Sequence, residues 1–203
     1  MLSIDYSLFQ LMNGWAVASQ PLGMVAIFLA RWLIYILIIG VASIGLWSVI
    51  VSRRTAGANR AALNLAIFIR AAFAVSGAVI DSSLISLVMF RSRPFVTQVE
   101  ATLLIDPPLT IKSFPSDHTT IAFAIAVSVW LLDRRLGWLM LIGAIGIAGG
   151  RVMAGVHYPL DVLAGAMLGT AWALVVMLVA RHWQDIKWLQ VQIDKIHGRR
   201  NKI

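Results

Sequence analysis

Long apolar runs separated by short polar turns dominate the pattern of the chain. An apolar stretch from Pro21 to Val51 is broken only by Arg31, and its uninterrupted part, residues 32–51, is 20 residues long. A helix of about 20 residues crosses about 30 Å of hydrocarbon. Four further apolar segments follow, at residues 61–90, 119–132, 136–149 and 160–180. The pattern predicts an all-α integral membrane protein, a single domain over residues 1–203 with a bundle of about five transmembrane helices.

The two ends of the chain differ from these spans. Four apolar residues near the start recur at helical spacing: Leu8, Leu11, Met12 and Trp15. This spacing predicts an amphipathic interfacial helix whose role is to anchor the chain. Because residues 1–20 contain no Lys or Arg, they do not resemble a cleavable signal peptide. Residues 182–203 form a basic tail with apolar residues at helical spacing, which predicts a second interfacial segment.

The composition agrees with a membrane protein. Hydrophobic residues make up 60% of the chain and charged residues 13%, whereas a soluble domain is about half apolar and about a quarter charged. The chain has no cysteine, which excludes disulfides and thiolate chemistry. A metal would therefore need His and carboxylate ligands.

The net charge of +8 has two interpretations, nucleic-acid binding or retention of basic loops in the cytoplasm. Counting Lys and Arg in alternate connections separates them. One side of the predicted bundle holds eleven: Arg53, Arg54, Arg60, Arg134, Arg135, Arg181, Lys187, Lys195, Arg199, Arg200 and Lys202. The other side holds four: Arg91, Arg93, Lys112 and Arg151. The asymmetry predicts an outer N-terminus and a cytoplasmic C-terminus, and it removes the main support for nucleic-acid binding.

Polar residues of the outer side fall at the ends of the second to fifth predicted spans. They are Arg93, Ser116, Asp117, His118, Arg151, His157 and Asp161. Guanidinium groups offer forks of donors that suit phosphate oxygens. The Pro115-Ser116 pair before an apolar run also predicts a helix start, where free amides favour an anion. These residues predict an anion site on the outer face.

The same residues resemble the type 2 phosphatidic acid phosphatase (PAP2) superfamily. Three motifs occur in order: Arg93-Pro94, then residues 115–118 reading Pro-Ser-Asp-His, then Arg151 followed by His157 and Asp161. The resemblance covers about residues 60–180 and is closest to the bacitracin-resistance type of undecaprenyl-diphosphatase. Three departures occur. Ser86 stands where the family has Lys, Asp117 where it has Gly, and Gly150 where it has Ser. Arg91 and Lys112 are the candidates to replace the missing lysine.

The resemblance implies a role for each matched residue. His157 would attack phosphorus to form a phosphohistidine, Asp161 would fix its tautomer, and His118 would protonate the leaving oxygen and then activate water. Phosphate-binding residues would be Arg93, Ser116, Arg151, Asp117 and Lys112. The resemblance implies no cofactor and no metal.

The implied function is hydrolysis of the terminal phosphate of undecaprenyl diphosphate at the outer face of a bacterial cell membrane. One alternative is a phosphatase for phosphatidylglycerophosphate, phosphatidate or a lipid A phosphate. Another is a lipid-binding or transport protein without turnover. Membrane lipids and the lipid substrate are the expected partners. Three ionisable residues within the spans, Arg31, Arg70 and Asp81, have either a functional or a structural role, and Arg31 is a candidate to bind a lipid phosphate. His182 and His197 in the tail are not expected to act in catalysis.

Overall fold

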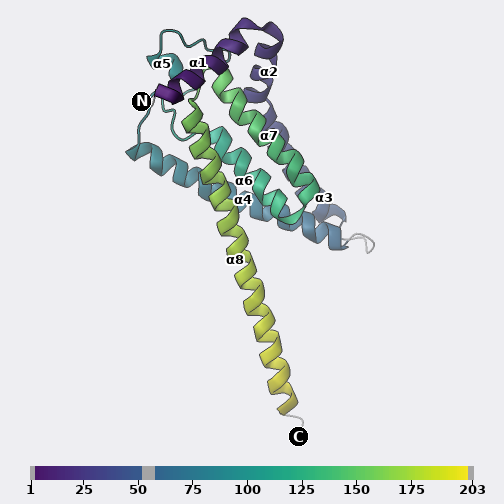
Figure 1. Ribbon diagram of the computed structural model, residues 1–203. Helices are drawn as coiled ribbons and strands as arrows, with labels where there is room; N and C mark the ends of the chain where they lie inside the picture. Colours follow the sequence, from purple (N-terminus) through teal and green to yellow (C-terminus); the bar gives the residue numbers. More distant parts are fainter. Residues whose placement is uncertain (1–2, 52–57, 201–203) are drawn as a thin grey trace.

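The chain forms a helical bundle with one long helix projecting from it (Figure 1). The computed structural model describes the backbone of residues 3–51 and 58–200, and the side chains of residues 4–47 and 63–182. The helices are α1 Ser3–Ala18, α2 Gln20–Arg31, α3 Leu33–Val51, α4 Ala58–Val88, α5 Pro94–Thr97, α6 Asp117–Leu132, α7 Arg134–Met153 and α8 Pro159–Arg200. Over these ranges the chain has no strand, so the predicted all-α fold is confirmed.

Three helical segments are long and apolar enough to cross a membrane: Leu63–Val88, Arg134–Met153 and Pro159–His182. The segments Gln20–Arg31 and Leu33–Trp47 would make a fourth span together, with a bend of 42° between them. The bend falls at Trp32, beside the only charge in this apolar stretch. α6 is apolar but has only 16 residues, about 24 Å of helix. The predicted five-helix bundle thus contains up to four full-length spans and one shorter central helix.

The short helix α6 lies in the middle of the bundle, packed against α3, α4, α7 and α8. Small side chains line several of its faces: Thr119, Thr120, Ala122, Ala124, Ala126 and Ser128 are all buried. On α8, a Cβ at Gly165 would lie 2.7 Å from the Ser116 carbonyl oxygen, and one at Gly169 would lie 2.2 Å from that of Thr120. Small residues thus let the two backbones approach closely, which fixes the start of α8 against the start of α6.

Glycines on α7 allow the same close approach on the opposite flank. A Cβ at Gly143 would lie 3.2 Å from Leu37, and one at Gly150 would lie 2.7 Å from Leu29. α2 and α3 therefore lie directly against α7.

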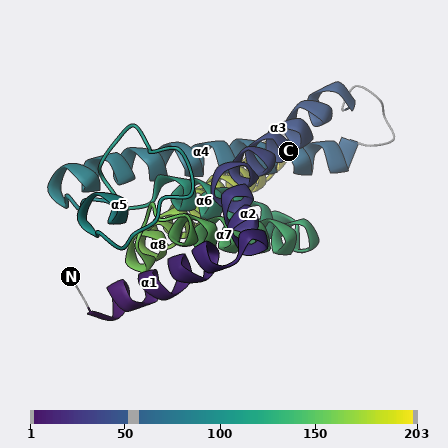
Figure 2. The same ribbon diagram turned by 90° about the horizontal axis from the view of Figure 1, so that it is seen from above.

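The N-terminal helix α1 lies across one end of the bundle (Figure 2). Its predicted apolar residues Leu8, Leu11 and Trp15 point away from the protein and are exposed. Its opposite face is buried, and there Asn13 donates to the carbonyls of Thr102, at 2.9 Å, and Met153, at 2.8 Å. The expectation that this segment only anchors the chain was too narrow, because α1 also holds the loop after α4 and the end of α7.

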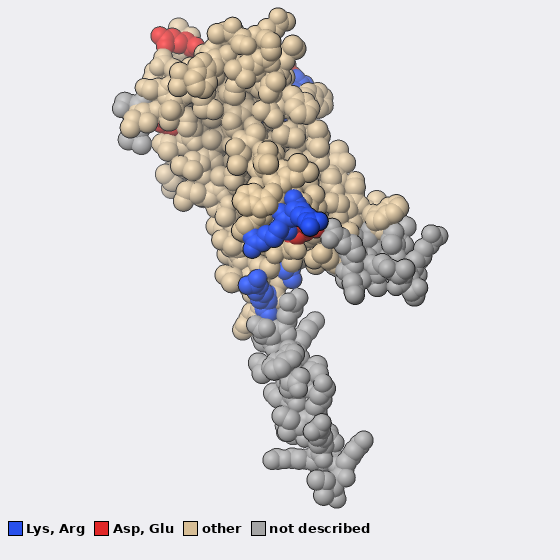
Figure 3. All heavy atoms as spheres, turned by 45° about the vertical axis from the view of Figure 1, so that its right-hand side comes forward, with Lys and Arg blue, Asp and Glu red and all other residues tan. Residues whose placement is uncertain are grey.

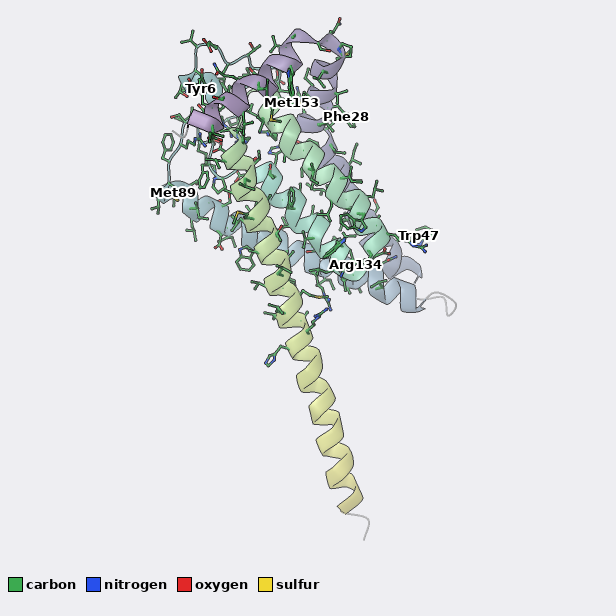
Figure 4. All side chains as sticks on the ribbon, viewed as in Figure 1. Tyr6, Phe28, Trp47, Met89, Arg134 and Met153 are labelled. Carbon is green, nitrogen blue, oxygen red and sulfur yellow. The ribbon has the colours of Figure 1, made fainter. Side chains whose placement is uncertain are left out.

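The two ends of the bundle differ in character. Tyr6 and Met153 lie at the end covered by α1, and Arg134 and Trp47 lie at the other (Figure 4). The largest visible group of Lys and Arg side chains lies near the end from which α8 projects (Figure 3). The predicted apolar positions of the tail beyond residue 182 lie outside the described side chains.

Candidate active site

The loop between α4 and α6 folds back on itself at the end covered by α1. Ser92 and Lys112 form an antiparallel bridge. Next to it, the Arg93 amide donates to the Ile111 carbonyl at 3.2 Å and the Ser113 amide to the Arg91 carbonyl at 2.7 Å. This pairing brings two separate parts of the loop together beside the start of α8.

A tight turn between α7 and α8 positions His157. Gly155 adopts φ +84°, and a Cβ there would lie 2.4 Å from the Thr102 carbonyl oxygen, so both conformation and space require glycine. The Tyr158 amide then donates to the Asp161 carboxylate at 2.8 Å, which caps the first turn of α8. As a result the His157 side chain is only 2% exposed.

The contacts of the His157 imidazole define its tautomer. Nδ1 lies 2.9 Å from the Ser113 carbonyl oxygen, and because a carbonyl can only accept, Nδ1 carries the proton. The Asp161 carboxylate is farther from Nδ1, at 3.8 Å, and accepts instead from the Ser113 hydroxyl. Sequence reasoning expected Asp161 to fix the tautomer, and that role stays a prediction. The Ser113 carbonyl is the nearer acceptor for Nδ1, and the Asp161 carboxylate also holds Ser113.

The other ring nitrogen faces two cations. Nε2 lies 3.1 Å from an Arg93 guanidinium nitrogen and 3.4 Å from one of Arg151. With Nδ1 protonated, Nε2 holds a lone pair directed at both. Burial lowers the pKa of His157 to about 4, and the two guanidinium groups act in the same direction. The imidazole is therefore neutral at physiological pH.

Backbone carbonyls hold both arginines in place. Arg93 donates to the carbonyls of Thr110, at 2.8 Å, and Val156, at 3.0 Å. Arg151 donates to the Ala30 carbonyl at 3.2 Å, and its buried Nε has no partner within the described part of the chain. Burial lowers the pKa of Arg93, while the charges of Asp117 and Asp161 raise it. Two buried guanidinium groups that converge without a carboxylate between them suit an anion with several acceptor oxygens.

His118 approaches the same region from the first turn of α6. It lines a cavity of about 210 Å³ together with Arg151, Tyr35 and Arg31. His118 is also within electrostatic range of His157 and both buried arginines. The two imidazoles that sequence reasoning paired are thus at the same end of the bundle, and Arg151 is close to both.

Ser116 immediately precedes α6 and is fully buried. Its hydroxyl accepts from Thr119 at 3.1 Å and makes no capping bond to the helix backbone. Its amide donates to the Asp161 carbonyl at 3.0 Å. The hydroxyl proton of Ser116 therefore remains available for a ligand.

Lys112 lies where the family lysine is missing. Its ammonium is 3.3 Å from the Ser86 hydroxyl and 3.4 Å from the Asp117 carboxylate. Ser82 donates to the same carboxylate at 2.6 Å. Of the two candidate replacements, Lys112 is thus the one whose charge reaches Ser86.

Arg91, the other candidate, binds carboxylates instead. Its guanidinium lies 2.8 Å from Asp161 and 2.5 Å from Asp5, and stacks 3.8 Å over the Tyr158 ring. Asp5 also accepts from the Leu160 amide at 2.9 Å. Sequence reasoning missed Asp5 and Ser113 as residues that support the site. The only signal for Asp5 was its position as the sole acidic residue in the first 20.

The Gly150 departure from the family motif also has a structural cause. A Cβ at Gly150 would lie 2.9 Å from the Ala30 amide nitrogen, so α2 occupies the space that a side chain would need. The adjacent Arg151 donates to the Ala30 carbonyl. The absence of a side chain at Gly150 therefore lets α2 brace Arg151.

The remaining ionisable residues lie apart from this cluster. Asp81 accepts from the Trp172 indole at 2.8 Å, so it pairs within the bundle, and Arg70 lies 2.9 Å from the Met177 sulfur. His182 is exposed on α8, and the side chain of His197 lies outside the described residues. Among the side chains that are described, no three His, Asp or Glu form a group suited to a metal ion.

Together these features define a class, a helical membrane protein in which a buried imidazole contacts two guanidinium groups that suit an oxyanion. The model of the PAP2 superfamily matches residues 62–185. The chain belongs to this superfamily, and it is a membrane hydrolase that acts on phosphate bonds.

Similar proteins agree with this assignment. The chain is 31% identical to the bacitracin transport permease protein BcrC of Bacillus licheniformis, over 98% of this chain and 90% of that protein. It is 43% identical to the undecaprenyl-diphosphatase BcrC of Bacillus subtilis, over 44% of this chain and 45% of that protein. The crystal structure of LpxE from Aquifex aeolicus has the same fold, with a TM-score of 0.62 at 22% identity, covering 87% of this chain and 96% of that one.

Proposed function

We propose that the protein removes the terminal phosphate of a polyprenyl diphosphate such as undecaprenyl diphosphate, with His157 as the nucleophile. The main support for this proposal is the environment of His157. Its Nε2 lone pair faces Arg93 and Arg151 at 3.1 and 3.4 Å, while the Ser113 carbonyl holds the Nδ1 proton at 2.9 Å. A neutral, oriented imidazole between two phosphate-binding cations is what nucleophilic attack on phosphorus requires.

In the first step, phosphoryl oxygens replace Nε2 as the hydrogen-bond partners of the Arg93 and Arg151 guanidinium groups. The Nε2 lone pair forms a bond to phosphorus, and the bond from phosphorus to the bridging oxygen breaks. His118, protonated on both ring nitrogens once the anionic diphosphate is bound, donates a proton to that oxygen and becomes neutral, so the lipid monophosphate leaves. The pair of buried cations offsets the negative charge that gathers on the equatorial oxygens.

In the second step, His118 takes a proton from water, and the resulting hydroxide attacks phosphorus and breaks the bond to Nε2. The proton on Nδ1 lets the ring carry positive charge while phosphorylated, and the Ser113 carbonyl and the Asp161 carboxylate stabilise that charge. Arg91 neutralises the rest of the charge on Asp161 at 2.8 Å. Asp161 and Arg91 therefore act by positioning His157.

Ser116 and Lys112 complete the phosphate site in this proposal. The Ser116 hydroxyl has a proton to donate at the start of α6, where helix amides favour an anion. Lys112 supplies the charge that the family carries at position 86. Asp117, a carboxylate, would repel phosphate directly, so its part is to hold Lys112, which lies 3.4 Å away.

Two features favour a lipid as the carrier of the phosphate. The B. subtilis relative is named an undecaprenyl-diphosphatase. An apolar cavity of about 230 Å³ is lined by α3, α4 and α6 through residues such as Ile38, Phe68 and Ile121. Ile38 and Ile121 follow Tyr35 and His118 by three residues, about one helical turn, so the apolar cavity lies about one turn further along α3 and α6 than the polar cavity and suits a hydrocarbon chain.

The active site would face the outside of a bacterial cell membrane, with the C-terminus in the cytoplasm. The excess of Lys and Arg on the opposite side supports this orientation. Release of lipid monophosphate outside the cytoplasm would regenerate the carrier of surface polysaccharides.

The test is phosphate release from purified protein in detergent, comparing undecaprenyl diphosphate with phosphatidate, phosphatidylglycerophosphate and a lipid A phosphate. We expect the highest kcat/KM for the diphosphate. Faster turnover of one of the other lipids would favour the first alternative function. No phosphate release from any of them would favour a lipid-binding or transport protein, an alternative supported by the name of the B. licheniformis relative, a transport permease protein.

A further inference from the structure

A polar cavity shares His118 and Arg151 with the candidate active site. The cavity has a volume of about 210 Å³, and Arg31, Tyr35 and Asp106 also line it. Arg31 ends α2 at the bend before Trp32, and Asp106 belongs to the loop after α4. Two segments 75 positions apart therefore line this cavity together with His118 and Arg151.

We propose that this cavity binds the inner phosphate of a diphosphate lipid, with Arg31 as its principal ligand. The inference rests on the proposed function and adds a specificity-determining residue to it. The ligand is defined by chemistry: the phosphate that stays on the lipid after the terminal phosphate has left.

The residues that the cavity shares with the active site support this assignment. Arg151 belongs to both regions, because its guanidinium lies 3.4 Å from His157 Nε2 and also lines the cavity. His118, the proton donor, lines the cavity, whereas His157 is not among its lining residues. In this proposal the leaving group of a phosphoryl group bound at Nε2 lies toward His118 and Arg31.

For a diphosphate, the leaving group is itself a phosphate. When the bond from the terminal phosphorus to the bridging oxygen breaks, the electron pair stays on that oxygen, which receives the proton of His118. The lipid monophosphate keeps at least one negative charge, and Arg31 would stabilise it as the bond breaks. For a phosphate monoester the leaving group is an uncharged alcohol, which offers Arg31 no charge to bind.

Arg31 can exchange the Asp106 carboxylate for a phosphate at little cost in stability. Its Nη1 lies 2.6 Å from the Asp106 carboxylate, but the two side chains are 46% and 77% exposed. Ion pairs this exposed contribute little to stability, so a phosphate can replace the Asp106 carboxylate at the guanidinium. Arg31 also lies 5.5 Å from the centre of the Trp32 ring, a contact that keeps it at the rim of the cavity.

The experiment compares wild-type protein, Arg31→Gln and Asp106→Asn on two substrates, undecaprenyl diphosphate and a diacyl phosphate monoester. Both variants break the ion pair, but only the first removes the proposed ligand. We expect Arg31→Gln to lower kcat/KM for the diphosphate about 10- to 100-fold more than for the monoester, the effect of losing a charged hydrogen bond. Asp106→Asn should keep or raise kcat/KM for the diphosphate, because a competing carboxylate is gone.

Equal losses in the two variants would show that the ion pair has a structural role and would overturn the inference. Equal losses on the two substrates in Arg31→Gln would also overturn it, while leaving the proposed function intact. A wild-type protein that releases no phosphate from the diphosphate would instead overturn the proposed function, and this inference with it. Arg31→Lys, which keeps the charge, should recover part of the loss on the diphosphate.

Discussion

At the scale of single residues, the chemistry depends on which nitrogen of His157 is free. The Ser113 carbonyl takes the Nδ1 proton, and the buried ring faces two guanidinium groups with its lone pair. A charged imidazole there would place three cations in one buried cluster. Burial and the neighbouring charges therefore keep the nucleophile neutral, with Nε2 ready to attack.

The protonation of His157 can be measured directly. Because its pKa is lowered to about 4, the neutral form should persist as pH falls through 6.5, the ordinary value for histidine, and should be lost only near pH 4. Nitrogen-15 NMR of the imidazole at pH 5.5, assigned with His157→Gln, should show a neutral ring protonated on Nδ1. A ring protonated on both nitrogens at pH 5.5 would contradict the assignment.

Lys112 offers a second residue-scale prediction. Its ammonium lies 3.3 Å from the Ser86 hydroxyl, so a lysine at position 86 can supply the same charge from α4. Lys112→Ala should lower kcat/KM for the lipid substrate about 10-fold, as expected for a lost charged hydrogen bond. The double variant Lys112→Ala with Ser86→Lys should recover most of that loss.

The control for this exchange is Ser86→Ala, which removes only a hydroxyl and should have little effect. If Ser86→Lys restores none of the activity lost in Lys112→Ala, the charge of Lys112 is not equivalent to that of the family lysine.

At the scale of helices, the site is assembled from helix ends, and close backbone contacts set their positions. α8 carries Asp161 and meets α6 through Gly165 and Gly169. The turn at Gly155 sets the direction of His157. Displacement of α8 along α6 would therefore separate Asp161 and His157 from the residues of α6.

A pair of glycine substitutions tests this packing. Gly169→Ala puts a Cβ 2.2 Å from the Thr120 carbonyl oxygen and 2.8 Å from the Ala124 amide nitrogen, so backbone must move. We expect a loss of about 1–3 kcal/mol in stability and a fall in activity. Gly149→Ala is the matched control, because nothing lies within 4 Å of its Cβ. Thermal unfolding in detergent that leaves the two variants equally stable would contradict the packing account.

Part of the helix arrangement could be predicted from the sequence. Hydrophobic runs predicted the helices because that signal is local, and the motif residues at the ends of the predicted spans indicated which helix ends meet. The buried face of α1 could not be predicted, since it depends on the contact between Asp5 and Leu160, 155 positions apart. The role of Ser113 could not be predicted either. Its main-chain carbonyl orients His157, and because every residue has such a carbonyl, the sequence does not mark this one.

At the scale of the whole molecule, the exposed group of Lys and Arg side chains and the candidate active site lie at opposite ends of the bundle (Figures 3 and 4). Val99, in the loop beside Tyr158, is fully exposed at the site end, and His182 is exposed at the end of the apolar segment Pro159–His182 of α8. The natural chain has no cysteine, so a single introduced thiol reports its own side of the membrane.

We predict that a membrane-impermeant maleimide added to intact cells labels Val99→Cys and not His182→Cys. Permeabilised cells should show labelling of both. The reverse pattern would turn the active site toward the cytoplasm and contradict the proposed orientation.

The most direct test of the central claim is chemical trapping of the intermediate. Wild-type protein mixed with substrate labelled in its terminal phosphate, and quenched in alkali within one turnover, should carry an acid-labile label on the peptide containing His157. His157→Gln should carry none and release no phosphate. Label on another residue, or phosphate release by His157→Gln at the wild-type rate, would contradict the assignment of His157 as the nucleophile.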